Sequence, residues 1–226
     1  MSIKENLEKI KQQIRAKSKL VGRDPQEITL VAVAKTVEVD RIEEAIASGV
    51  TIVGESRVQE ANEKYRKVGN KVIWHLVGHL QRNKAKDAVK IFDLIHSVDS
   101  VKLANEIDKQ ARNGGKIQKI LIEVNVSGEE SKYGLSPEEL IPFLKEISEL
   151  ANVRVKGLMT MAPLYENPDY SRPHFRKLRE LMEKVKAQNI INVEMKYLSM
   201  GMTNDFEVAI EEGSNMVRIG RAIFGP

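Results

Sequence analysis

Residues 29–40, TLVAVAKTVEVD, begin as a run of apolar side chains and turn polar at a lysine. Residues 30–34 contain no polar group, so they predict a strand that is buried on both faces, as strands of parallel sheets are. Lys35 shares side-chain parity with Val31 and Val33. If those valines face the interior of a barrel, Lys35 faces its mouth, because alternate side chains of a strand point to the same side.

Seven more apolar runs follow this one along the chain, and amphipathic stretches separate them. The eight runs are ITLVAVAK (28–35), TIVGE (51–55), VIWHLVG (72–78), DLIHSV (93–98), KILIEVNV (119–126), VRVKGLMTM (153–161), YLSMG (197–201) and MVRIG (216–220). Eight alternations of strand and helix favour a closed (β/α)8 TIM barrel over an open doubly wound sheet. The 226 residues suit one such barrel, so we expect a single domain over 1–226.

The two ends of the chain predict one addition to the ordinary barrel. Ile3, Leu7, Ile10 and Ile14 recur at helical spacing, which predicts an extra amphipathic helix before the first strand. After the last strand only RAIFGP remains, which is too short for a full outer helix. We expect the N-terminal helix to cover that gap in the outer ring.

Four capping residues predict where outer helices begin. Asp40, Ser56 and Ser100 each precede an amphipathic stretch and are predicted as N-caps. Ser136, with Pro137 and Glu139 behind it, forms a capping-box pattern at the start of SPEELIPFLKEISEL.

Composition excludes several classes of protein. The chain has no cysteine, so a disulfide framework and a thiolate nucleophile are excluded. No stretch approaches 18 uninterrupted apolar residues, and the N-terminus lacks the apolar core of a signal peptide. Basic and acidic residues are interspersed and only 5% of residues are aromatic, which argues against nucleic acid as a partner despite a net charge of +4. His75 and His79 lack a third ligand in the pattern, so we expect no metal site. From the lack of a long apolar stretch and of a signal peptide, we expect no membrane contact and a cytoplasmic protein.

Lys35 is the first candidate for chemistry. Active sites of such barrels lie at the carboxyl ends of the strands, where the run 28–35 ends. A lysine there, with apolar neighbours and little water, is a nucleophile for a carbonyl group. A strand-end lysine whose ammonium simply extends to solvent is an equally good interpretation of this residue alone.

The last two loops favour the functional interpretation, because barrels often bind phosphate after strands seven and eight. Those loops are SMGMTND (199–205) and RIGRA (218–222). They offer side-chain donors, glycines that let an anion approach the backbone, and two cations: Ser199, Thr203, Asn204, Gly201, Gly220, Arg218 and Arg221. A helix starting near Thr203 or Asn204 would add its positive end. Each loop alone also suits an ordinary βα turn, but with Lys35 they predict a site for a phosphorylated carbonyl compound.

The motifs also resemble a known family over nearly the whole chain. VAVAKTV, GESRVQEANEK, WHLVGHLQRNKAK, HSVDSVKLANEI, NVSGEESKYGL, VKGLMTMAP and LSMGMTNDFEVAIEEGSNMVRIGRAIFG occur in order from residue 31 to 225. They are similar to the successive motifs of the pyridoxal phosphate (PLP) homeostasis proteins. That resemblance implies a barrel like that of alanine racemase, with PLP held as a Schiff base on Lys35.

The resemblance also implies roles for the other site residues. Thr203 and the backbone at Gly220 and Arg221 would hold the phosphate, Ser199 and Met200 would line the pocket, Arg218 would lie near the pyridine nitrogen and Met159 would pack close to the ring. The family commonly has Asn in GEN where this chain has Ser56 in GES, and we expect the shorter Ser56 hydroxyl to donate the hydrogen bond to the cofactor instead.

Whether bound PLP would catalyse a reaction is a separate question. An electron sink needs a protonated ring nitrogen, which an arginine at that place disfavours. The sequence ends at Pro226, directly after the last strand and its short tail, and we expect no second domain to supply another acid–base residue. We therefore expect a PLP carrier in intracellular homeostasis that buffers PLP or delivers it to apo-enzymes, with other B6 vitamers as possible ligands.

Three alternatives stay open: a weak PLP-dependent amino-acid racemase, a Schiff-base aldolase, and a sensor of a phosphorylated ligand whose output is a protein partner. The irregular segment 162–175 suits a lid or an inert connection. Nothing in the sequence resembles a dimerisation element, so we expect a monomer.

Overall fold

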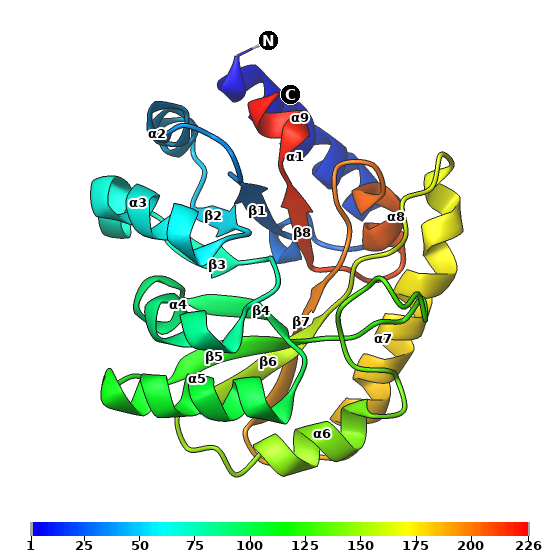
Figure 1. Ribbon diagram of the computed structural model, residues 1–226. Helices are drawn as coiled ribbons and strands as arrows, with labels where there is room; N and C mark the ends of the chain where they lie inside the picture. Colours follow the sequence, from blue (N-terminus) through cyan, green and yellow to red (C-terminus); the bar gives the residue numbers. More distant parts are fainter. Residues whose placement is uncertain (1, 226) are drawn as a thin grey trace.

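A closed barrel of eight parallel strands in chain order forms the centre of the molecule (Figure 1). The computed structural model describes residues 2–225. The strands are β1 Thr29–Val33, β2 Ile52–Glu55, β3 Ile73–Leu76, β4 Leu94–Val98, β5 Gln118–Glu123, β6 Val153–Met159, β7 Val193–Ser199 and β8 Met216–Ile219. The predicted (β/α)8 barrel is confirmed; β7 begins four residues before the predicted run because its first residues alternate with exposed polar ones.

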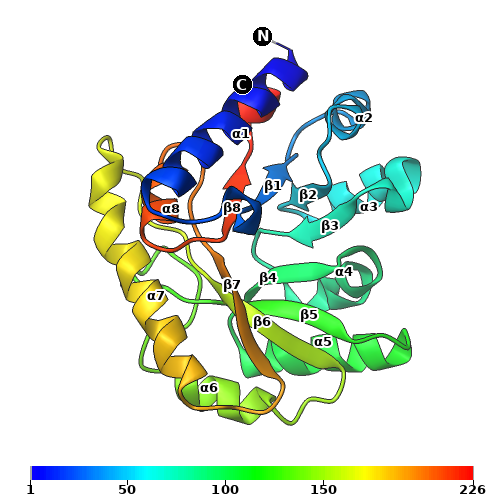
Figure 2. The ribbon, with the colours of Figure 1, turned by 180° about the vertical axis from the view of Figure 1, so that it is seen from behind.

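Helices surround the barrel, and short 3-10 turns lie between some of them (Figures 1 and 2). The α-helices are α1 Ile3–Leu20, α2 Val39–Ala47, α3 Val58–Val68, α4 Ala85–Ile91, α5 Val101–Asn113, α6 Leu140–Ile147, α7 Arg172–Lys186, α8 Phe206–Glu211 and α9 Arg221–Phe224. Within residues 2–225, no helix is both long enough and apolar enough to cross a membrane.

The N-terminal helix completes the outer ring where the last unit is short. Four apolar residues of α1 are buried, namely Ile3, Leu7, Ile10 and Ile14. They face the barrel beside α8 and α9, and Figure 2 shows α1 lying next to α8 and β8. Because α9 has only four residues, α1 takes the place of a full eighth helix, as the sequence predicts.

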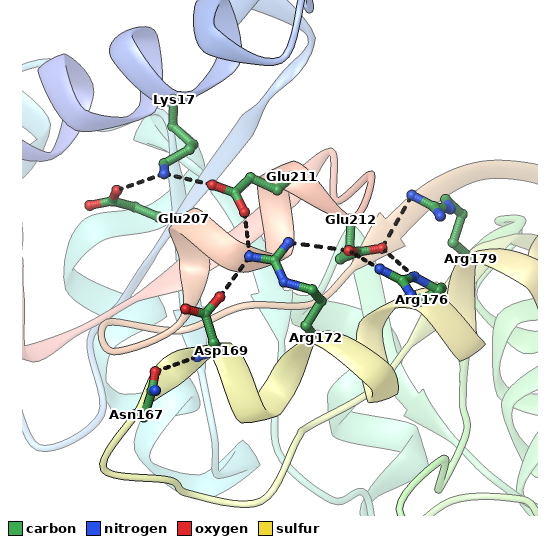
Figure 3. A network of polar contacts seen from close by, with 9 residues as sticks. All are labelled: Lys17, Asn167, Asp169, Arg172, Arg176, Arg179, Glu207, Glu211 and Glu212. Atoms are coloured by element: carbon green, nitrogen blue, oxygen red, sulfur yellow. Dashed lines mark hydrogen bonds and ion pairs between the residues drawn. The ribbon is translucent and has the colours of Figure 1, made fainter.

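Charged side chains tie α1 and α7 to α8 (Figure 3). Lys17 of α1 pairs with Glu211 of α8 at 2.7 Å, and Glu211 pairs in turn with Arg172 of α7 at 2.6 Å. Glu212 follows directly and is nearly buried, with only 5% of its side chain exposed. Three arginines surround its carboxylate: Arg172 at 3.2 Å, Arg176 at 3.0 Å and Arg179 at 3.4 Å.

The apolar core has two parts. One lies between the sheet and the helices, and the other fills the barrel with Val31, Val77, Leu94, Leu121, Met159 and Met216. Val33 packs against the inner part, so the predicted parity of β1 is correct and Lys35 comes next on the same side, at the mouth.

Three of the four predicted helix caps are wrong. Helix α2 begins at Val39 behind Glu38, and α3 begins at Val58 behind Arg57, neither with a side-chain cap. Ser100 caps α5 as predicted, by accepting from the Leu103 N–H at 3.4 Å. Helix α6 begins only at Leu140, behind Glu139, so Ser136 is not its N-cap; the Ser136 hydroxyl instead donates to the Glu139 carboxylate in the turn that precedes the helix.

Candidate functional site at the barrel mouth

A cavity of about 200 Å³ opens at the carboxyl end of the barrel, where the segments after β1, β2, β3, β6, β7 and β8 converge. Its wall consists of Val33, Lys35, Ser56, Val77, Met161, Ala162, Pro163, Leu164, Met202, Thr203, Asn204, Asp205, Arg218, Gly220 and Arg221. Six of the nine predicted cofactor residues thus share one cavity: Lys35, Ser56, Thr203, Arg218, Gly220 and Arg221.

Lys35 stands in a tight turn just after β1. The Val37 N–H donates to the Ala34 carbonyl at 3.0 Å, which closes a β-turn with Lys35 and Thr36 at its centre. Thr36 has φ of 62°, the positive value that marks the third position of a type II turn. Lys35 itself is exposed, so the predicted desolvation of its amine is wrong. The turn lifts the lysine out of the apolar run and presents it to the cavity and to solvent.

The loop after β7 forms the opposite wall, and it differs from the predicted helix terminus. Helix α8 begins at Phe206, later than expected, and the Asp205 carboxylate accepts from the Met202 N–H at 2.7 Å inside the loop. Burial raises the pKa of that carboxyl group. Gly201 has φ of 94°, and a Cβ there would lie 2.6 Å from the Cβ of Ala209. The positive φ and close packing against α8 therefore explain this glycine.

Gly220 provides a second close approach, between the ends of β8 and β1. A Cβ at this position would lie 3.1 Å from the Val33 carbonyl oxygen, so a larger residue would crowd the end of β1. Gly220 therefore keeps the cavity open beside Lys35, with Thr203 and Arg221 on the same wall.

Arg218 closes the floor of the cavity. Its side chain is buried, and its two terminal nitrogens donate to Ser199 Oγ at 2.6 Å and to the Thr160 carbonyl at 2.9 Å. Burial lowers the pKa of Arg218 to about 10, while Asp205 and Glu123 oppose that shift. The guanidinium therefore stays a cation at neutral pH and has a fixed direction.

Two histidines continue this polar chain into the barrel. His96 Nδ1 lies 3.1 Å from Ser199 Oγ, and His96 Nε2 lies 3.1 Å from His75 Nδ1. Burial lowers the pKa of His75 to about 3 and that of His96 well below its ordinary value. Both rings are thus neutral hydrogen-bonding groups. His79, in contrast, stacks on Tyr133 at a centroid distance of 3.9 Å near the rim.

Three predicted residues lie away from the cavity wall. Met159 fills the barrel core, Met200 lies in the core outside the sheet, and Ser199 is buried beneath Arg218. These three residues were predicted from their positions in the motifs. Such a position does not distinguish a residue that lines the cavity from one that packs behind the lining. The wall residues Val77, Met161, Leu164 and Met202 were missed; inward parity with the barrel core is the signal that would have found Val77.

A buried carboxyl group near the mouth was also missed. Glu123 ends β5 and is 3% exposed, and its Oε2 has no hydrogen-bond partner among the described residues. Burial, helped by Asp99 and opposed by Arg218, raises the pKa of Glu123 to about 7. This side chain therefore changes its charge near neutral pH.

Comparison with known proteins places the chain in a family. The family model described as alanine racemase, N-terminal domain, matches residues 2–226. A pyridoxal phosphate homeostasis protein of Aquifex aeolicus is 44% identical over 226 residues, covering 100% of this chain and 98% of the relative. One of Vibrio alginolyticus is 38% identical over 229 residues, covering 99% of this chain and 97% of the relative.

The chain belongs to the family of pyridoxal phosphate homeostasis proteins.

Solved structures with the same architecture include both a similar protein and a more distant enzyme. The PipY protein of Synechococcus elongatus, with PLP bound, is 34% identical, with a TM-score of 0.85 over 99% of this chain and 100% of that chain. An alanine racemase of Clostridium difficile is 17% identical and aligns with a TM-score of 0.74 over 98% of this chain and 56% of that chain. The likeness to the racemase shows the barrel fold alone.

Proposed function

We propose that this protein binds pyridoxal 5'-phosphate in the mouth cavity and acts as an intracellular carrier of it. One observation supports this most strongly: the amine of Lys35 and a set of anion-binding groups, Thr203, Gly220 and Arg221, line one cavity. An amine at one wall and anion donors at another suit a ligand that is both an aldehyde and a phosphate ester. The PLP-bound relative, aligned over 99% of this chain, supports the same assignment.

The residues present fit the cofactor. Lys35 is exposed and lines the cavity, so its amine would be accessible to form a Schiff base with the aldehyde. The Thr203 hydroxyl and the Arg221 guanidinium would bind phosphate oxygens. Arg218 would face the ring nitrogen from the floor, and Ser56 would contact the ring from the side of β2. Bound PLP would supply an electrophilic aldehyde and a conjugated ring.

Carriage is favoured over turnover by what lines the wall. Turnover of an amino acid needs a proton donor or acceptor beside the reacting carbon. Among the described residues, the cavity wall contains no histidine, tyrosine or cysteine, and its one carboxylate, Asp205, is already bonded to the Met202 N–H. A racemase or Schiff-base aldolase activity remains the alternative, and the exposed Lys35 is the feature that favours it.

Absorption titration tests the binding. The wild type should develop the absorption band of a Schiff base with PLP, and Lys35→Ala should bind PLP more weakly and without that band. Pyridoxine 5'-phosphate, which lacks the aldehyde, should bind both proteins equally. A wild type that gives no such band would refute the proposal.

Two further assays separate the functions. Transfer of PLP from the loaded protein to an apo-enzyme faster than spontaneous release would establish delivery, and transfer at the release rate would establish buffering alone. Exchange of the Cα hydrogen of amino acids for deuterium, at enzymatic rates, would contradict carriage and support the racemase.

A further inference from the structure

The turn that presents Lys35 has an unusual residue at its third position. Type II turns need a positive φ there, which favours Gly or Asn, but this chain has Thr36 with φ of 62°. A β-branched residue in this conformation is strained, and such strain persists only where the surroundings impose it. Among residues 2–225, the other two non-glycine residues with positive φ are Asn189 and Asn192. The conformational preference of Thr36 therefore does not explain the turn at Lys35, and contacts from elsewhere in the fold must stabilise it.

Helix α3 provides the contacts that hold it. The Thr36 N–H donates to Glu60 Oε1 at 2.6 Å, so a carboxylate of α3 binds the backbone directly after Lys35. The Lys64 ammonium donates to the Ala34 carbonyl at 2.7 Å, so a cation of the same helix binds the backbone directly before it. The two side chains also pair with each other at 2.8 Å.

The third proton of Lys64 anchors the pair to the sheet. It is donated to Glu55 Oε1 at 2.7 Å, at the end of β2. Lys64 has 8% of its side chain exposed, and its three donors are thereby all used. Partial burial acts to raise the pKa of Glu60, but bonds from Lys64 and the Thr36 N–H outweigh it and lower that pKa. Glu60 is thus an anion whenever the turn is formed at neutral pH.

We propose that Glu60 and Lys64 are positioning residues for Lys35: they hold the backbone on both sides of it and so direct its amine into the cavity. Neither residue lines the cavity, and both act through the turn. This inference rests on the proposed function, since it assumes that Lys35 forms the bond to PLP. Misplacing a reacting group by about 1 Å can cost about a hundredfold in reaction rate, so a loosened turn should weaken the covalent step more than the phosphate contacts.

The test compares Glu60→Ala with Glu63→Ala, which removes an exposed carboxylate from the same helix. We expect Glu60→Ala to raise the Kd for PLP about tenfold or more, with less than a twofold change for pyridoxine 5'-phosphate. Glu63→Ala should match the wild type with both. Equal Kd values of Glu60→Ala and wild type for PLP would overturn the inference, and so would equal losses for both ligands.

A rescue variant addresses the mechanism and any folding defect. Glycine adopts positive φ without strain, so Thr36→Gly added to Glu60→Ala should restore most of the PLP affinity. Failure of this rescue would overturn the claim that Glu60 acts through the turn.

Hydrogen exchange gives a readout without the cofactor. In the ligand-free protein, the Thr36 amide should be protected in the wild type and in Glu63→Ala, and should exchange at least tenfold faster in Glu60→Ala. An unprotected Thr36 amide in the wild type would overturn the inference. If the wild type fails to bind PLP while this protection holds, the proposed function fails and the turn contact stands.

Discussion

The Arg218 guanidinium donates from Nη1 to the Ser199 hydroxyl at 2.6 Å, beneath the floor of the cavity. Because a guanidinium cannot accept, Ser199 uses a lone pair for it, and its own proton is available for His96 Nδ1. His96 is then protonated at Nε2 and donates to Nδ1 of His75. The hydrogen bonds from Arg218 through Ser199 and His96 to His75 thus all donate in the same direction, from the cavity floor into the barrel. This chain fixes the orientation of Arg218.

This direction predicts the tautomer of each histidine. Nitrogen chemical shifts of labelled protein should show His96 and His75 neutral and protonated at Nε2 between pH 8 and pH 5, since burial lowers the pKa of both rings. Protonation of His96 at Nδ1, or a charged ring at pH 5, would contradict the assigned chain.

Removing the central hydroxyl should destabilise the fold. Ser199→Ala leaves a buried guanidinium N–H and the Nδ1 of His96 without a partner, at a cost of about 1–3 kcal/mol in the free energy of unfolding. Urea titration measures it. Ser131→Ala, at an exposed serine, is the control and should stay within about 0.5 kcal/mol of the wild type. A Ser199→Ala variant as stable as this control would show that the hydroxyl contributes nothing.

Glu123 should make stability fall as pH rises. Its pKa is about 7 in the folded chain against the ordinary 4.5, so the unfolded chain releases this proton first and the folded state loses stability from about pH 4.5 to pH 7. Glu123→Gln cannot ionise. Its stability relative to the wild type should therefore increase between pH 4 and pH 8, by about 3 kcal/mol.

The control for this experiment is Glu130→Gln, at an exposed carboxylate in the loop after β5. Urea titrations at both pH values should give parallel pH dependences for this variant and the wild type. A pH-independent difference between Glu123→Gln and the wild type would mean that Glu123 has no raised pKa.

The contacts of Glu212 should stabilise the ring of helices. Burial acts to raise its pKa, but Arg176 and Arg172 outweigh burial and lower it, so the contribution is present above about pH 4.5 and lost as pH falls below it. Glu212→Ala should cost about 1–2 kcal/mol at pH 7, less than for a fully buried pair because the arginines are partly exposed.

Glu183→Ala is the matched control, because it breaks an exposed carboxylate–cation pair, that of Glu183 with Lys186. It should lower the free energy of unfolding by less than about 0.5 kcal/mol. Urea titration at pH 7 and pH 4 compares them. Equal losses in both variants at pH 7 would contradict a special role for the nearly buried carboxylate.

The barrel could be predicted because its strands are apolar on both faces, and inner parity alone placed Lys35 at the mouth. The turn at Thr36 could not: a Thr-Val-Glu-Val sequence favours extended backbone, and the contacts that override it come from Glu60 and Lys64 of another element. Local sequence does not contain such long-range contacts.

The site, like the fold, could be predicted only in part. Loop motifs identified residues that face the cavity, such as Thr203 and Gly220, but could not distinguish them from Ser199, which supports Arg218 from below. Glu123 lacked any motif, and its raised pKa arises from burial that only the closed barrel creates.

We propose that Lys35 forms the bond to PLP, and borohydride reduction gives the most direct test. The wild type is incubated with PLP, reduced, digested and mapped by mass spectrometry, with Lys35→Ala alongside. We expect a stable phosphopyridoxyl group on the peptide that contains Lys35, and no comparable labelling of any peptide of the variant. Labelling spread over exposed lysines, equal in both proteins, would contradict it.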